Sequence, residues 1–169
     1  PDRPYYLGSL SKPFTAAAIL QLVEAGRLSI DDPVQKWLPD IILNGPQAEA
    51  LKVSHLLRHR SGLTRRQGSI PVPTLEEMRE QPFELKLYYP PGSREEYSNL
   101  NYVLLGLLIE RVSEQSFAGY LRDSIFLPLD MNNSYCHREA AGDQLIPGRQ
   151  FWFGIPVESE QAGYQETAI

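Results

Sequence analysis

A serine and a lysine stand three residues apart near the start of the sequence, at Ser9 and Lys12. On a helix, side chains at this spacing face the same way, with Cβ atoms about 5–6 Å apart. A serine hydroxyl becomes a good nucleophile only when a neighbouring base takes its proton. A lysine amine can be that base when it is uncharged near neutral pH, a state that burial and nearby positive charge favour. The pair therefore predicts a serine nucleophile with its general base, which is the chemistry of acyl transfer.

Two further polar residues, Tyr97 and Asn99, come just before a long apolar segment. A phenol can pass protons between a nucleophile and a leaving group, and an amide side chain can hold a substrate carbonyl. Each of the two motifs also arises by chance. A serine three residues before a lysine is most often a helix cap beside a surface lysine. Their joint occurrence favours one catalytic site over that alternative.

Four longer segments carry a resemblance to a known family: "LGSLSKPFTAAAILQLVEAGRLSIDDPVQKWLP", "VSHLLRHRSGL", "PPGSREEYSNLNYVLLGLLIERVSEQSF" and "IFLPLDMNNS". In this order they resemble the serine β-lactamase and penicillin-binding-protein superfamily, in its class C β-lactamase-like, esterase-like branch. The first motif of that superfamily is S-x-x-K. The resemblance covers about residues 6–134.

The resemblance implies a role for each candidate residue. Ser9 resembles the acylated nucleophile, Lys12 its general base, and Tyr97 the residue that shares the proton transfer. Asn99 resembles the amide that orients the substrate, and the backbone N–H of Ser9 would form half of an oxyanion hole. An acyl-enzyme on an ester, D-amino-acid peptide or β-lactam carbonyl is implied, with a small-molecule or peptide substrate and no cofactor. Members commonly act outside the cytoplasm, sometimes tethered to a membrane. The alternative is a non-catalytic member or fragment that serves as a binding or scaffold module.

Composition limits the function classes. With 169 residues, of which 42% are hydrophobic, the chain can form one domain with a core. A net charge of −5 argues against a nucleic-acid partner. Four arginines nevertheless cluster, and we interpret them as a solvated loop rather than an anion site: Arg58, Arg60, Arg65 and Arg66. The single cysteine, Cys136, excludes an internal disulfide framework, and no apolar run reaches the roughly 18 residues of a membrane span.

The elements that must hold the candidate residues are mostly helices. Alanines and leucines after Lys12 favour a helix that ends at Gly26, with Ser9 or Ser11 as its N-cap. Because Pro13 clashes with a carbonyl four residues back, we expect an irregular or tight first turn. Further helices are expected within 29–39, at about 52–58, from Thr74, over 98–115 with Ser98 or Asn99 as cap, and at about 116–125. Only residues 85–89 and 151–157 favour strands.

These elements predict an α+β fold of the β-lactamase/transpeptidase type, mostly its helical part, as one partial domain over residues 1–169. The third motif of the resembled family, Lys/His-x-Gly on a sheet strand, has no match after Asn99. Strands that precede the nucleophile helix in that family are also missing. We therefore expect the sequence to be an internal piece of a larger hydrolase.

Other candidate sites are weaker. His55 and His59 have the spacing of a helical zinc site, but Leu56 stands where a zinc protease has its glutamate, so we interpret both histidines as structural and expect no metal. His59 begins "HRSGL", which resembles the family's HTSGL landmark with Arg60 in place of a small residue. No G-x-S-x-G surrounds Ser9 and no phosphate-binding loop is present. Three aromatic residues are expected in the core or at its rim: Trp37, Trp152 and Phe153.

Overall fold

The fold is helical with two small pairs of strands. The computed structural model describes residues 4–5, 7–69, 77, 80–137, 148–152 and 155–159. The helices are α1 (Lys12–Glu24), α2 (Val34–Trp37), α3 (Val53–Leu57), α5 (Asn99–Ser113) and α6 (Phe117–Leu121). The strands are β1 (Ile41–Asn44), β2 (Phe83–Lys86), β3 (Gly148–Trp152) and β4 (Ile155–Ser159). Short 3-10 turns cover Gly8–Ser11, Ala48–Ala50, Arg65–Ser69 and Leu127–Leu129, and a π-turn covers Arg122–Phe126.

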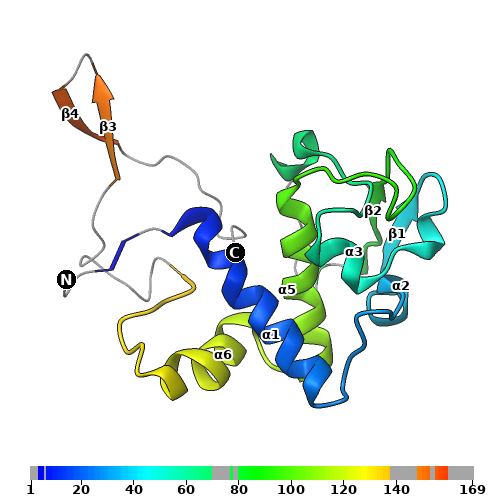
Figure 1. Ribbon diagram of the computed structural model, residues 1–169, viewed down its shortest axis with the longest axis horizontal. Coiled ribbons are helices and arrows are strands. Elements are labelled where there is room, and N and C mark those ends of the chain that lie inside the picture. Colours follow the sequence, from blue (N-terminus) through cyan, green and yellow to red (C-terminus); the bar gives the residue numbers. More distant parts are fainter. Residues whose placement is uncertain are drawn as a thin grey trace.

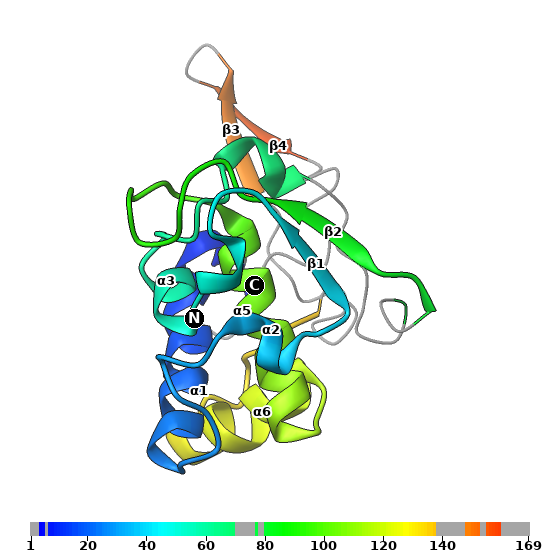
Figure 2. The ribbon, with the colours of Figure 1, turned by 90° about the vertical axis from the view of Figure 1, so that its right-hand side faces the viewer.

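Helices α1 and α5 pack side by side at the centre of the molecule (Figures 1 and 2). The buried residues of α1 recur at helical spacing: Lys12, Thr15, Ala18, Ile19 and Leu22. Helix α5 is buried over most of its surface, and its largest buried side chains include Leu100, Leu104, Leu105, Leu108 and Ile109. Each fully buried leucine or isoleucine contributes about 1.5–3 kcal/mol. This packing fixes α1 against α5, and Lys12 belongs to the buried face of α1.

The start of α1 departs from a regular helix, as expected from Pro13. Residues Gly8–Ser11 form a 3-10 turn, and Gly8 has a φ of 55°, in the left-handed region that favours glycine. Ser11 occupies the N-cap position of α1, as one of the two expected candidates, but its side chain makes no capping hydrogen bond. The Ser11 hydroxyl donates instead to the carbonyl of Gly8, at 2.7 Å. The hydroxyl of Ser9 turns away from the α1 backbone and is free to meet other side chains.

The strands correct the sequence-based expectations. β1 was not expected, and it pairs in parallel with β2, with Ile41 opposite Phe83. The strand expected at residues 85–89 begins earlier and ends at Lys86, because the N–H of Tyr88 leaves the sheet and donates to Gly62. Residues 151–157 are not one strand: they divide between β3 and β4, which pair antiparallel and so satisfy each other's backbone groups. Figure 1 shows this hairpin standing apart from the helices.

The expected helices within 29–39, at 52–58 and at 98–115 are confirmed as α2, α3 and α5. The helix expected at 116–125 is α6, which continues as the π-turn and ends in the turn that contains Pro128. Ser116 is the N-cap of α6, and its hydroxyl oxygen accepts from the N–H of Gly119. The start of the helix expected from Thr74 lies outside the described residues, as does Phe153. The predicted α+β class is confirmed, with few strands among the described residues.

Gly62 offers a test of this fold. Its φ is 91°, and a Cβ there would overlap the carbonyl oxygen of Tyr89, whereas Gly26, with a φ of 68°, has open space around it. We expect Gly62→Ala to lower the free energy of unfolding by more than about 2 kcal/mol, because strain and a backbone clash add. In Gly26→Ala only the strain of a positive φ applies, because no atom lies near the new Cβ, and the free energy of unfolding should fall by about 1 kcal/mol. Denaturant unfolding of both variants measures the difference, and equal losses would contradict the close packing at Gly62.

Candidate active site

Ser9, Lys12, Tyr97 and Asn99 form one hydrogen-bonded group. The Ser9 Oγ and the Tyr97 hydroxyl oxygen are 2.7 Å apart. The Lys12 amine donates to Ser9 Oγ at 3.4 Å and to Asn99 Oδ1 at 3.0 Å. The Tyr97 hydroxyl also lies 3.0 Å from Asn99 Oδ1. The structure thus brings together all four residues that the sequence singled out.

Three elements place these side chains. Ser9 lies in the 3-10 turn and Lys12 at the first position of α1, so the two stand one turn apart. Asn99 is the first residue of α5, and Tyr97 precedes it in the entering loop. Because α1 packs on α5, the N-terminal ends of both helices meet at the Lys12 amine.

The four side chains differ in their access to solvent. Ser9 and Asn99 are exposed and Tyr97 is half-buried, whereas Lys12 is only 8% exposed. The Lys12 amine lies 5.2 Å from the ring centre of Tyr97 and 5.5 Å from that of Tyr102. The hydroxyl of Ser9 is therefore open to a substrate while the amine approaches it from inside the protein.

The phenol of Tyr97 ionises more readily than that of an ordinary tyrosine. Burial is the largest single influence on its pKa and raises it. The hydrogen bonds with Lys12 and Ser9, together with the positive charges of Lys12 and Arg65, lower the pKa by more than burial raises it. The pKa of Tyr97 therefore lies below its usual value of 10.0. Arg65 contributes from the 3-10 turn that it begins, with its guanidinium carbon 5.4 Å from the ring centre. A lowered pKa suits a phenol that exchanges protons with Ser9.

Comparison with known sequences decides the family. The sequence model of the Beta-lactamase family matches residues 1–145. This chain belongs to the β-lactamase family. Penicillin-binding protein 4* of Bacillus subtilis (strain 168) is 33% identical over 165 residues, which make up 92% of this chain and 36% of that protein.

Solved structures of the β-lactamase family share the fold. The octameric penicillin-binding protein homologue from Pyrococcus abyssi is 35% identical with a TM-score of 0.71, over 93% of this chain and 39% of that one. The β-lactamase/D-alanine carboxypeptidase from Yersinia pestis is 28% identical with a TM-score of 0.73, over 86% of this chain and 44% of that one. The expected β-lactamase/transpeptidase-like fold is confirmed. The chain spans less than half the length of each of these relatives.

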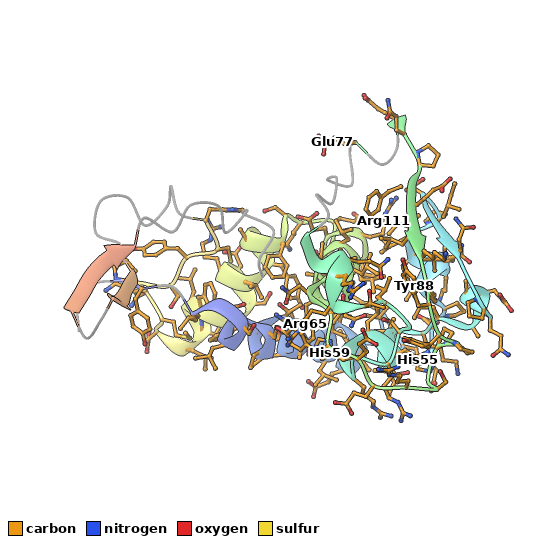
Figure 3. All side chains as sticks on the ribbon, turned by 90° about the horizontal axis from the view of Figure 1, so that it is seen from above. His55, His59, Arg65, Glu77, Tyr88 and Arg111 are labelled. Carbon is orange, nitrogen blue, oxygen red and sulfur yellow. The ribbon has the colours of Figure 1, made fainter. Side chains whose placement is uncertain are left out.

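His59 also lies at this candidate site, which the sequence did not predict. Its ring centre lies 4.6 Å from that of Tyr97 and 5.3 Å from that of Tyr102. Arg65 contacts the same Tyr97 ring, and Figure 3 labels both His59 and Arg65. The available signal was the position of His59 at the start of "HRSGL", a landmark that resembles a motif of the family.

His55 serves a different purpose, on α3. Its Nδ1 accepts from the backbone N–H of Lys52, at 3.2 Å, and closes the first turn of that helix. Within the described ranges, no group of three or more His, Cys, Asp and Glu side chains is placed to hold a metal ion. Nor is any helix in the described part of the chain long and apolar enough to cross a membrane.

The remaining candidates from the sequence are four arginines, two tryptophans and the cysteine. All four clustered arginines are exposed, as a solvated loop requires, and among them Arg65 also contacts Tyr97. Trp37 is partly buried against the core in α2, where its ring N–H donates to Asp32 at 3.0 Å. Burial raises the pKa of the Cys136 thiol to about 11, which favours the protonated thiol near neutral pH. Trp152 lies in β3.

Proposed function

We propose that this chain is one part of a serine hydrolase and that Ser9 is its nucleophile. The observation that carries the proposal is the 2.7 Å approach of the Tyr97 hydroxyl to Ser9 Oγ, with the Lys12 amine 3.4 Å from the same oxygen. Activation of a serine needs a proton acceptor within hydrogen-bond reach. Two such groups stand beside Ser9, and both are tied to Asn99.

The reaction proceeds through an acyl-enzyme. Ser9 Oγ attacks the substrate carbonyl carbon while its proton passes to the Lys12–Tyr97 pair: to the amine when it is uncharged, or to the phenolate when the amine beside it is charged. The negative charge that develops on the carbonyl oxygen is held by the backbone N–H of Ser9, which forms half of an oxyanion hole. The bond to the leaving group then breaks, and the leaving group takes the proton back from the Lys12–Tyr97 pair. Water adds to the acyl group, and release of the acid restores Ser9.

Asn99 orients both the base and the substrate. Its Oδ1 accepts from the Lys12 amine, and its exposed position leaves the amide nitrogen free to approach a substrate carbonyl. The substrate is an ester or a D-amino-acid peptide, and β-lactams are a further possible class of acyl donor. The name of the Yersinia pestis relative, a β-lactamase/D-alanine carboxypeptidase, supports the peptide and β-lactam classes.

Covalent labelling tests this proposal. The full-length protein is treated with a fluorescent alkyl phosphonate or a fluorescent penicillin, and the adduct is located by peptide mass spectrometry. We expect a single adduct, on Ser9, that heat denaturation before treatment prevents. An adduct on another residue would reject Ser9 as the nucleophile. No adduct from either class of probe would favour a non-catalytic binding module.

A further inference from the structure

His59 holds the segment that carries Tyr97 and Asn99. Its Nδ1 accepts from the backbone N–H of Ser98 at 3.3 Å and lies 3.0 Å from the side-chain nitrogen of Asn101. The carbonyl of His59 accepts from the N–H of Glu96 at 2.8 Å. Both chain neighbours of Tyr97 are therefore bonded to one residue, whose ring also stacks on the Tyr97 ring.

These bonds determine the protonation of the ring. The N–H of Ser98 belongs to the backbone and can only donate, so Nδ1 must carry a lone pair rather than a proton. The nitrogen of the Asn101 side chain then donates to the same Nδ1. A neutral ring with its proton on Nε2 satisfies both contacts, whereas a doubly protonated ring would place an N–H against the N–H of Ser98.

The charged and titratable groups around His59 favour that neutral ring. Burial is the largest cause that lowers the pKa of His59 from its usual 6.5, followed by the positive charge of Lys12. The negative charge of Glu95 acts in the opposite direction and is weaker. Tyr97 and Tyr102 face the ring from the loop before α5 and from α5 itself.

We propose that His59, in the form with Nδ1 unprotonated, is the positioning residue that keeps Tyr97 and Asn99 within reach of Ser9 and Lys12. The inference rests on the proposed function, because positioning is read out through acylation of Ser9. Protonation of the ring removes the acceptor for Ser98 and frees the segment. His59 thereby sets an acidic limb of the acylation rate: the rate is full above pH 6.5 and falls as the pH drops through the lowered pKa of His59.

Two substitutions test whether His59 acts through the hydrogen-bond acceptor Nδ1 or only through the space that its ring fills. In His59→Asn the side-chain oxygen can replace Nδ1 as acceptor, and asparagine tolerates the φ of 52° at this position. His59→Ala removes the acceptor. We expect His59→Ala to lower the acylation rate at saturating probe about 10- to 100-fold with little change in probe affinity, because the reacting groups are misplaced. The acylation rate of His59→Asn should stay within about threefold of the wild-type rate, and it should no longer fall as the pH drops below 6.5.

The matched control is His55→Asn, which alters the histidine that is bonded to Lys52 and not to the candidate site. It should keep the wild-type rate and pH profile. A wild-type rate in His59→Ala, or a rate in His59→Asn no better than in His59→Ala, would overturn the inference. Should His59→Ala not fold, the comparison of His59→Asn with the wild type across pH decides it.

Nitrogen NMR of the histidine rings supplies a readout that needs no activity. At pH 7.5 we expect the wild-type His59 ring to carry its proton on Nε2 and to titrate below 6.5. A proton on Nδ1 would overturn the inference even if acylation is normal. If the wild type takes up no probe while NMR finds the proton on Nε2, the proposed function fails and the hydrogen-bonded arrangement at His59 stands.

Discussion

Ser9→Ala is expected to lower the rate of covalent labelling by at least about 10⁴-fold, because loss of a nucleophile removes the acyl-enzyme route altogether. The fold should survive the change. Ser9 is exposed, and its hydroxyl bonds to Tyr97 and Lys12 rather than to the core, so the free energy of unfolding should change by less than about 1 kcal/mol. Labelling kinetics with the phosphonate probe, beside thermal unfolding of both proteins, measures the two effects.

Ser11→Ala is the matched control for this experiment. Ser11 lies two residues away in the same 3-10 turn, but its hydroxyl donates to the carbonyl of Gly8 instead of to the polar group. The Ser11→Ala variant should be labelled at the wild-type rate, with only a small loss in the free energy of unfolding. Undiminished labelling of Ser9→Ala would show that another nucleophile reacts, and the assignment of Ser9 would then be wrong.

The sequence could predict each half of the candidate site, because each half is local. The spacing of Ser9 and Lys12 places both on one side of a helical turn, and Tyr97 and Asn99 are two residues apart at the start of α5. That the halves meet is not a local property. Lys12 and Asn99 are 87 residues apart, and their contact depends on how α1 packs against α5. Only the resemblance to a family joined the two halves in advance.

The elements that were missed share a physical reason. β1 is four residues long, and a run as short as Ile41–Asn44 has no measurable period until its partner β2 lies beside it. The contacts of His59 with the segment around Tyr97 could not be predicted from local sequence, because they join His59 to residues about 40 positions later in the chain. Ser11 is the N-cap residue of α1, but neither its hydroxyl nor that of Ser9 bonds to the helix start, because the tight turn before Pro13 offers both hydroxyls other partners. Contacts between distant parts of the chain decide β1, His59 and the Ser9 hydroxyl, whereas the Ser11 hydroxyl bonds within its own turn.

Lys12→Met is the second change with a large expected effect. Methionine keeps an apolar stem of similar length within the buried face of α1, so the packing is retained while the amine is lost. We expect the acylation rate to fall about 10³-fold, within the range that general-base catalysis supplies. Stopped-flow labelling under single-turnover conditions gives this rate, and unfolding experiments show whether the fold persists.

A loss of rate is expected whichever group takes the proton first. If the amine accepts it, Lys12→Met removes the base; if Tyr97 accepts it, the variant removes the cation that lowers the pKa of the phenol. The variant loses both contributions of Lys12 and keeps those of burial, Ser9 and Arg65, so the pKa of Tyr97 should rise above its wild-type value, which an ultraviolet titration of the phenol detects. Lys36→Met, which removes an exposed amine paired with Asp32, should leave labelling unchanged. Acylation of Lys12→Met at the wild-type rate would exclude the amine from the reaction, because no other lysine or arginine is bonded to Ser9 among the described residues.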